Sequence, residues 1–112
     1  MIGDLEFKIA QLIWNNEPIK SGELITLCAK RFGWKKSTTY TVLKRLCDKG
    51  LFENNNGIVK SLISENDYFG LESERAVNNL FNGSLPMFIS SFTQRQRLSE
   101  KDIEEIKRIL DL

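Results

Sequence analysis

The sequence predicts a mainly α-helical chain with one small β-hairpin. Two observations predict this fold class: apolar residues recur at helical spacing through most of the 112 residues, and residues 51–63 contain two β-prone runs around an Asn-Gly pair. Proline and glycine interrupt the helical pattern repeatedly, so the expected helices are short. A chain of this length is one domain, or a small domain with an appendage.

The first two expected helices lie on either side of Pro18, which cannot continue a helix. Ser21 is a suitable N-cap for the second helix, and Gly33 follows its last turn. The inward residues expected for the first helix are Ile2, Leu5, Ile9, Leu12 and Ile13. Those expected for the second helix are Leu24, Ile25, Leu27 and Cys28. Both patterns are typical of short amphipathic helices.

A third helix is expected after Trp34, ending at Gly50, since glycine suits the left-handed conformation that follows many helices. Two β-prone runs, 51–53 and 58–63, then flank the sequence NNNG, whose Asn-Gly pair favours a tight hairpin. Three helices followed by a hairpin is the order of a winged helix-turn-helix. We expect this module over residues 1–66.

Residues 67–112 are expected to form further helices. Ser84 and Ser99 are suitable N-caps, and Asp102 stands where it approximates a capping box with Ser99. The winged module needs little of this segment for its own core, so we predict a helical dimerisation region whose apolar faces are covered by a second subunit. The residues expected in that contact are Leu85, Phe88, Ile89, Phe92, Ile103, Ile106, Ile109 and Leu110.

Composition argues against catalysis and against a metal or cofactor. The chain has no histidine, which removes Ser-His and Cys-His catalysis and most zinc sites, and it has no Gly-rich phosphate loop. Cys28 and Cys47 stand alone in helical patterns and are expected to be buried, reduced thiols. No apolar run approaches the length of a membrane span, and acidic residues near the start argue against a signal peptide, so the expected location is the cytoplasm.

The net charge of +1 conceals a strong local asymmetry. Residues 30–49 contain seven Lys and Arg against the single acid Asp48, a net charge of +6, so the remainder of the chain is acidic. A basic patch within a nearly neutral protein favours a directed contact with a polyanion.

The third expected helix has two chemically different faces. At about 100° per residue, Thr39, Val42, Leu43 and Leu46 cluster on the inward side, with Cys47 at its edge. The opposite side carries hydroxyl residues, an aromatic and cations. Short side chains let a helix approach the floor of the major groove, hydroxyls can bond base edges or phosphates, and Lys and Arg neutralise phosphate or read guanine.

We therefore predict that this outer face binds double-stranded DNA. The candidate DNA-binding residues are Lys35, Lys36, Ser37, Thr38, Tyr40, Thr41, Lys44, Arg45 and, in the hairpin, Lys60. The alternative is an ordinary solvated face, and Lys60 in particular is compatible with solvent exposure alone.

The segment LIWNNEPIKSGEL, with GWKKSTTYTVLKRLCDKGLF after it, resembles the penicillinase-repressor family of BlaI and MecI type. The matching positions are Ile13, Trp14, Trp34 and the frame of Thr38, Thr41, Leu43, Arg45, Leu46, Lys49 and Gly50. The resemblance continues through residues 81–92 and 98–110. It implies a homodimeric winged-helix repressor that binds a dyad operator and controls β-lactamase or other resistance genes.

Two positions depart from the family pattern. Ile58 follows the hairpin glycine where the family has Arg or Lys, and Ser61-Leu62 stand where a Tyr is usual, which implies a weaker or different wing contact. In β-lactam-responsive members a protease of a membrane sensor system cuts an Asn-Phe bond in the dimerisation region. The matching pair here, and thus the candidate cleavage site, is Ser91-Phe92. Two alternatives remain: a repressor that answers another signal, and a winged module that binds protein instead of DNA.

Overall fold

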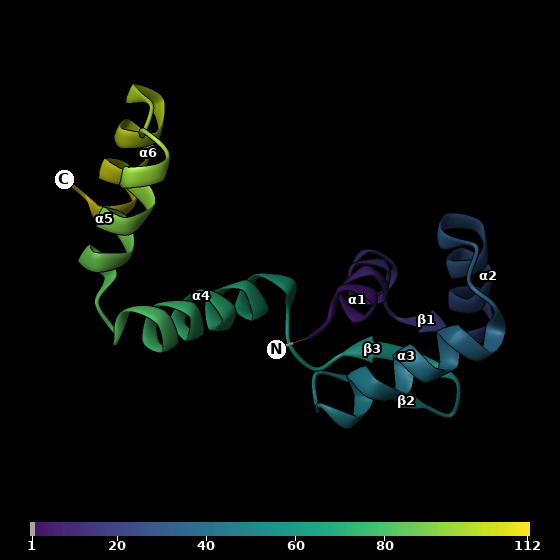
Figure 1. The fold of residues 1–112 in the computed structure, drawn as a ribbon. Helices are drawn as coiled ribbons and strands as arrows, with labels where there is room; N and C mark the ends of the chain where they lie inside the picture. The colour runs from purple at the N-terminus through teal and green to yellow at the C-terminus, as the bar shows by residue number, and fades with distance from the viewer. Residues whose placement is uncertain (1) are drawn as a thin grey trace. The chain divides into compact units, whose positions relative to one another are not determined.

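The structure, a computed structural model, describes residues 2–112. The fold class is confirmed: the chain is mainly helical, with one small antiparallel sheet (Figure 1). It divides into two compact units, the first ending at Glu72 and the second formed by Ser73–Leu112. The first unit contains α1 (Asp4–Asn16), β1 (Ile19–Lys20), α2 (Ser21–Phe32), α3 (Lys36–Asp48), β2 (Phe52–Asn55) and β3 (Ile58–Ser61). Helix α4 (Glu65–Phe81) begins in the first unit and ends in the second, which also contains α5 (Leu85–Arg95) and α6 (Glu100–Leu110).

The core of the first unit lies between its helices and one face of the sheet. Helix α3 packs against α1, α2 and β2, and α1 also contacts β3. The residues expected to face inward on α3 do so: Thr39, Val42, Leu43 and Leu46 are all buried. The most fully buried large side chains around them are Phe52, Ile9, Ile13, Leu24 and Val59. The periodicity of α3 therefore fixes which of its faces remains available at the surface.

The hairpin forms as predicted, with a two-residue turn. Asn56 and Gly57 have φ values of 52° and 86°, the pair of left-handed residues that a type I′ turn requires. The side-chain oxygen of Asn54 accepts the Gly57 N–H at 3.0 Å and closes the turn. Antiparallel pairing includes Asn54 opposite Val59 and Asn55 opposite Ile58, so β2 extends further into the asparagine run than expected.

A third strand was not expected from the sequence. Ile19 and Lys20 pair with Val59 and Ile58, which gives the strand order β1-β3-β2. This strand also explains why the prediction of Ser21 as an N-cap is wrong. The N-cap is Lys20, held extended by its place in β1, and the N–H of Ser21 donates to the carbonyl oxygen of Gly57 at 2.8 Å.

One residue of the predicted α1 stripe lies outside the core. Ile2, Ile9, Leu12 and Ile13 are buried, whereas the Leu5 side chain is 45% exposed. The nearby Ile2 and Glu6 are buried, so the start of α1 is covered on their side of the helix and not on the side of Leu5. The prediction that Leu5 points inward is therefore wrong.

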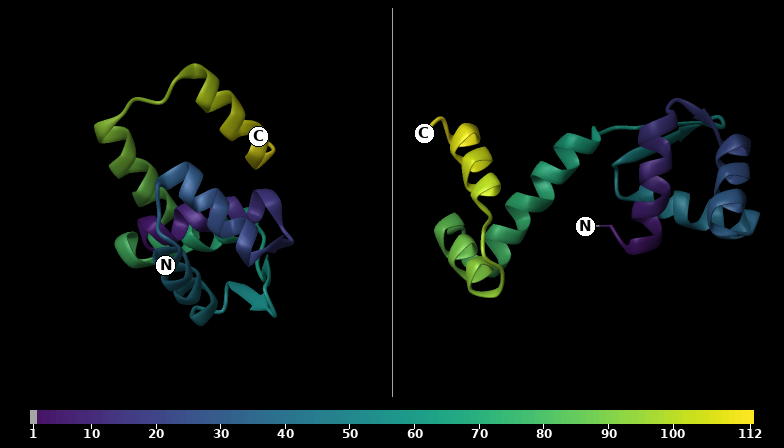
Figure 2. Two further views of the ribbon diagram at one scale, coloured as in Figure 1. Left: turned by 90° about the vertical axis from the view of Figure 1, so that its right-hand side faces the viewer. Right: turned by 90° about the horizontal axis from the view of Figure 1, so that it is seen from above.

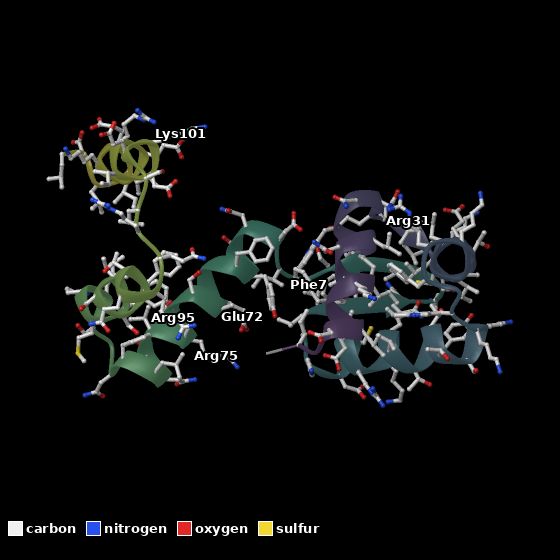
Figure 3. The ribbon with its side chains drawn as sticks, turned by 45° about the horizontal axis from the view of Figure 1, so that its top comes forward. Phe7, Arg31, Glu72, Arg75, Arg95 and Lys101 are labelled. Carbon is white, nitrogen blue, oxygen red and sulfur yellow. The ribbon has the colours of Figure 1, made fainter. Side chains whose placement is uncertain are left out.

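Aromatic side chains fix the start of α4 to the rest of the first unit. Tyr68 is buried, with its ring centroid 5.6 Å from that of Trp14. Phe69 lies 6.0 Å from Phe7, which Figure 3 labels on α1. The indole N–H of Trp14 donates to the carbonyl oxygen of Ile63 at 3.0 Å, just before α4 begins. The first turn of α4 thus belongs to the core of the winged module.

The second unit has well-formed helices but no core of its own. The hydroxyls of Ser84 and Ser99 accept backbone N–H groups of Met87 and Asp102 at 3.2 and 3.0 Å, so both predicted N-caps are confirmed. Figure 2 shows α5 and α6 as separate helices joined by a short extended segment. Within residues 73–112, all of which the structure describes, no residue is buried.

An ion pair joins the start of α1 to the end of α3. The Glu6 carboxylate, in a side chain only 11% exposed, pairs with the Lys49 ammonium and also accepts the Gly3 N–H at 3.0 Å. The hydrogen bond from Lys49 holds the pKa of Glu6 below its usual range, although burial opposes this effect. The charged form of Glu6 is favoured in the folded chain. The pair therefore stabilises the fold at pH values above the pKa that Glu6 has in the unfolded chain, and this stabilisation is lost as pH falls through the lower pKa that Glu6 has in the folded chain.

We therefore expect Glu6→Gln to lower the free energy of unfolding by about 1.5–3 kcal/mol at pH 7, the usual cost of losing a hydrogen bond to a charged partner. The difference from the parent chain should shrink as pH falls from 7 through the lowered pKa of Glu6, because protonation removes the charge that Lys49 stabilises. Urea unfolding at pH 7 and at a series of lower pH values, at one fixed chain concentration, measures it. Glu53→Gln is the control, because its pair with Lys60 lies on the exposed hairpin. A difference that stays constant with pH would refute the role given to the Glu6 charge.

Candidate nucleic-acid interface

A short turn presents α3 at the surface of the first unit. Helix α2 ends at Phe32, and Gly33 follows it in the left-handed conformation, with a φ of 69°. The Gly33 N–H donates a hydrogen bond to the Ala29 carbonyl oxygen and caps the helix. After Trp34 and Lys35 the chain enters α3. The Trp34 ring packs on Phe32 with centroids 5.0 Å apart, which fixes the connection between the two helices. This is the helix-turn-helix arrangement, with α3 as its second helix.

The predicted outer-face residues of α3 are accessible. Lys35, Lys36, Ser37, Tyr40, Thr41, Lys44 and Arg45 are exposed, and Thr38 is half-buried. The hydroxyl of Thr41 donates to the Ser37 carbonyl oxygen at 2.9 Å. Since its proton is committed to the helix backbone, Thr41 offers a partner an acceptor oxygen and a methyl group. Such a side chain suits a base amino group or the methyl of thymine.

Tyr40 and Lys36 form a pair on the first turns of the helix. The Lys36 ammonium lies 5.9 Å from the centre of the Tyr40 ring, within the range of a cation–π contact. Tyr40 is 40% exposed, so its ring lies at the surface of the helix. The contact keeps one positive charge near the N-terminal end of α3.

The C-terminal half of α3 carries paired charges instead. The Lys44 ammonium contacts both carboxylate oxygens of Asp48, at 3.0 and 3.3 Å, and both side chains are largely exposed. An exposed pair of this kind contributes only about 0.3–0.5 kcal/mol, so Lys44 can leave Asp48 for a phosphate at little cost. Lys49 contacts Glu6, and the positive charge of Arg45 also helps to lower the Glu6 pKa.

Charge is therefore distributed unevenly along the helix. Among residues 2–112, no acidic side chain pairs with Lys35 or Lys36 at the N-terminal end, and the last turn of α2, which precedes the turn into α3, carries Lys30 and Arg31. The positive end of the α3 dipole also lies at this end. Both effects favour phosphate there more strongly than near Asp48.

The hairpin contributes little net charge. Lys60 is exposed but pairs with Glu53 across the strands, at 3.5 Å. Ser61, where the family resemblance implies a tyrosine, donates its N–H and its hydroxyl to the Glu17 carboxylate at 2.9 and 2.7 Å. This serine therefore anchors the base of the wing to the segment after α1.

Sequence reasoning missed one residue beside the candidate interface. The exposed Leu5 lines a hollow of about 230 Å³ whose other walls come from α3. Those walls are Ser37, Thr38, Thr41, Val42 and Arg45. No sequence signal separates Leu5 from its buried neighbours, because its helical spacing is the same as theirs.

The residues predicted for dimerisation are exposed apolar side chains in the single chain. Seven of them are exposed, namely Leu85, Ile89, Phe92, Ile103, Ile106, Ile109 and Leu110, and Phe88 is half-buried. Phe88 packs edge-on to Phe81 and stacks with Phe92. With Leu80 and Ser91 these rings line a hollow of about 410 Å³ in the second unit. The candidate cleavage pair Ser91-Phe92 lies inside α5 and is exposed.

The remaining chemistry of the chain is sparse. Among residues 2–112, no three acidic or thiol side chains gather as a metal site, and no helix combines the length and apolarity needed to cross a membrane. Both thiols are free: Cys28 is buried as expected, whereas Cys47 is only half-buried. Burial raises the pKa of each thiol, so neither is an activated nucleophile.

Known proteins resemble this chain over almost its whole length. A penicillinase repressor from Bacillus licheniformis is 29% identical over 114 residues, covering 98% of this chain and 89% of that protein. The methicillin resistance regulatory protein MecI of Mammaliicoccus sciuri is 25% identical over 114 residues, covering 98% and 93%. A penicillinase repressor of Staphylococcus aureus is 24% identical over 110 residues, covering 95% and 87%. The family model described as penicillinase repressor matches residues 2–112, and the chain therefore belongs to this family of transcriptional repressors.

Proposed function

We propose that the protein is a homodimeric repressor that binds a dyad DNA operator through the outer face of α3. The observation that carries the proposal is the division of α3 into a buried apolar face and an exposed face of hydroxyls and cations. In this proposal Ser37, Thr38, Tyr40, Thr41 and Arg45 meet base edges or nearby phosphates. Lys35 and Lys36 neutralise phosphates at the N-terminal end, and Lys44 does so by exchanging Asp48 for the DNA backbone.

The hairpin plays a smaller part in this proposal. Lys60 is the wing cation that could meet a phosphate, and Glu53 must release it first. The neighbouring turn residues Asn55 and Asn56 are neutral. The affinity for DNA therefore comes mainly from the two helices of the helix-turn-helix.

Dimerisation through α5 and α6 is supported by the lack of buried residues in Ser73–Leu112. Burying an apolar side chain such as Ile106 or Phe92 contributes about 1.5–3 kcal/mol, and a single copy of the unit buries none of them fully. A second copy offers the same apolar surface, as a two-fold interface requires. The two α3 helices would then read two half-sites together.

We further propose that the target genes are β-lactamase or related resistance genes, as the names of the relatives indicate, and that cleavage at Ser91-Phe92 relieves repression. A cut there separates the first half of α5 from the seam formed by α6. Losing the link between two half-site modules lowers avidity by about 10²–10⁴-fold, even though α3 itself is untouched. A protease of a membrane sensor system is the partner that this step requires.

Alanine substitutions on α3 test the DNA contact. Thr41→Ala, Lys44→Ala and Arg45→Ala should leave the fold intact, because all three side chains are exposed. Thr41→Ala and Arg45→Ala should each weaken operator binding by about 1–3 kcal/mol where the residue reads a base, whereas Lys44→Ala removes a phosphate contact and should weaken operator and random DNA alike. Fluorescence anisotropy with a selected operator measures the affinity, and thermal unfolding checks the fold. Lys30→Ala is a control, expected to weaken operator and random DNA equally.

The same titrations separate the repressor from a module that binds protein. Operator binding should weaken steeply between 50 and 200 mM salt, since each neutralised phosphate adds about −0.9 to the slope of log K against log salt. Two results together would exclude α3 as the DNA-binding helix and favour the protein-binding alternative. They are an unchanged operator affinity in all three variants and an operator affinity that does not vary with salt.

A truncation tests the dimer. The predicted boundary at residue 66 would remove Tyr68, which lies in the core of the first unit, so the chain should end at Glu72 instead. We expect a folded monomer whose affinity for a dyad operator falls by about 10²-fold or more, because the half-sites are no longer linked. Analytical ultracentrifugation at micromolar concentration measures the assembly. A full-length chain that sediments as a monomer would contradict the proposal.

Cleavage is tested in the cells that produce the protein. After exposure to a β-lactam, an immunoblot should show a fragment ending near Ser91 appearing as the target genes switch on. Phe92→Leu is the matched variant, since it keeps an apolar residue in α5 while changing the residue after the cut. If the full-length band persists while the genes are induced, the repressor answers a different signal.

A further inference from the structure

Gly70 lies inside α4, where neither the backbone nor the packing requires a glycine. The helix runs from Glu65 to Phe81, and Gly70 follows its first turn. A Cβ atom at this position would meet no other atom within 4 Å, and its φ is not in the left-handed region. In a helix interior, glycine is about 1 kcal/mol less favourable than alanine, so the equilibrium constant for local unfolding of the helix is about fivefold larger. The residue therefore weakens α4 at one point, with no compensating contact.

The weak point lies next to the last anchored residues of the winged module. Tyr68 is buried against Trp14, and Phe69 packs against Phe7. After Gly70 the burial ends: Leu71 is 52% exposed, and the first unit stops at Glu72. Gly70 is thus the first position of α4 at which the backbone can bend without disturbing the aromatic cluster.

We propose that Gly70 is a specificity-determining residue, acting as the hinge that lets a dimer bind operators with different half-site spacings. The inference rests on the proposed function. Each added base pair moves a half-site by about 3.4 Å and turns it by about a tenth of a helical turn, which a rigid dimer cannot follow. A bend in α4 of each protomer, next to the DNA-binding unit, changes the orientation of α3. It alters neither the α3 surface nor the proposed dimer contact of α5 and α6.

The test is a binding-site selection from a library of random duplexes, using the full-length parent, Gly70→Ala and Gly22→Ala. Gly22 is the matched control: it is also helical, a Cβ there also meets no atom within 4 Å, and it lies in α2 within the winged module. The parent and Gly22→Ala should recover dyads with several spacings. Gly70→Ala should recover one spacing, and its affinity should fall about tenfold or more when that spacing is changed by one or two base pairs.

The outcomes separate this inference from the function on which it rests. If the parent recovers dyads and Gly70→Ala recovers the same range of spacings, the hinge is refuted while the repressor stands. If Gly70→Ala loses affinity equally at every spacing, the residue has a role in packing and the hinge is again refuted. If the parent recovers no dyad, the proposed function itself fails.

Discussion

The packing of α3 against α1 is the constraint on which the rest of the first unit depends. Thr39, Val42 and Leu46 occupy the core, so the rotation of α3 about its axis cannot change without exposing them. The Glu6–Lys49 pair adds a polar contact at the far end of the same interface. Together these contacts fix both the rotation and the position of α3. A helix that reads DNA needs this rigidity, because its side chains must meet base edges within hydrogen-bonding distance.

The distribution of charge on this fixed helix has a consequence for recognition. Unpaired lysines gather at the N-terminal end of α3, whereas Lys44 and Lys49 have acidic partners at the other end. Neutralising phosphates supplies affinity without sequence information, so the N-terminal end suits positioning. The middle of the helix offers hydroxyl and aromatic groups at positions 37–41, which suit readout. The wing adds almost no net charge, so in the proposed complex with DNA the helix-turn-helix would supply most of the affinity.

Local patterns predicted the helices, the hairpin and the inner face of α3, because each depends on residues close together in sequence. Features that depend on distant residues were not accessible in this way. Strand β1 has only two residues and exists because β3 offers them partners 40 and 38 residues along the chain, Val59 for Ile19 and Ile58 for Lys20. Lys49 looked like part of a basic patch, but it pairs with Glu6, 43 residues away. Leu5 had the spacing of a core residue and lies exposed beside α3, since helical periodicity does not show how closely a neighbouring helix covers each position.

The C-terminal unit has apolar faces on α5 and α6 and no buried residue. Under the proposed assembly, two chains must meet to pair through this unit. When the protein is scarce, the concentration of paired chains therefore grows with the square of the concentration of single chains. Repression would then respond to protein level more steeply than it would for a one-chain repressor. When growth dilutes the protein faster than synthesis replaces it and its concentration halves, the paired form falls by more than half, so genes under its control become sensitive to growth rate as well as to any inducer.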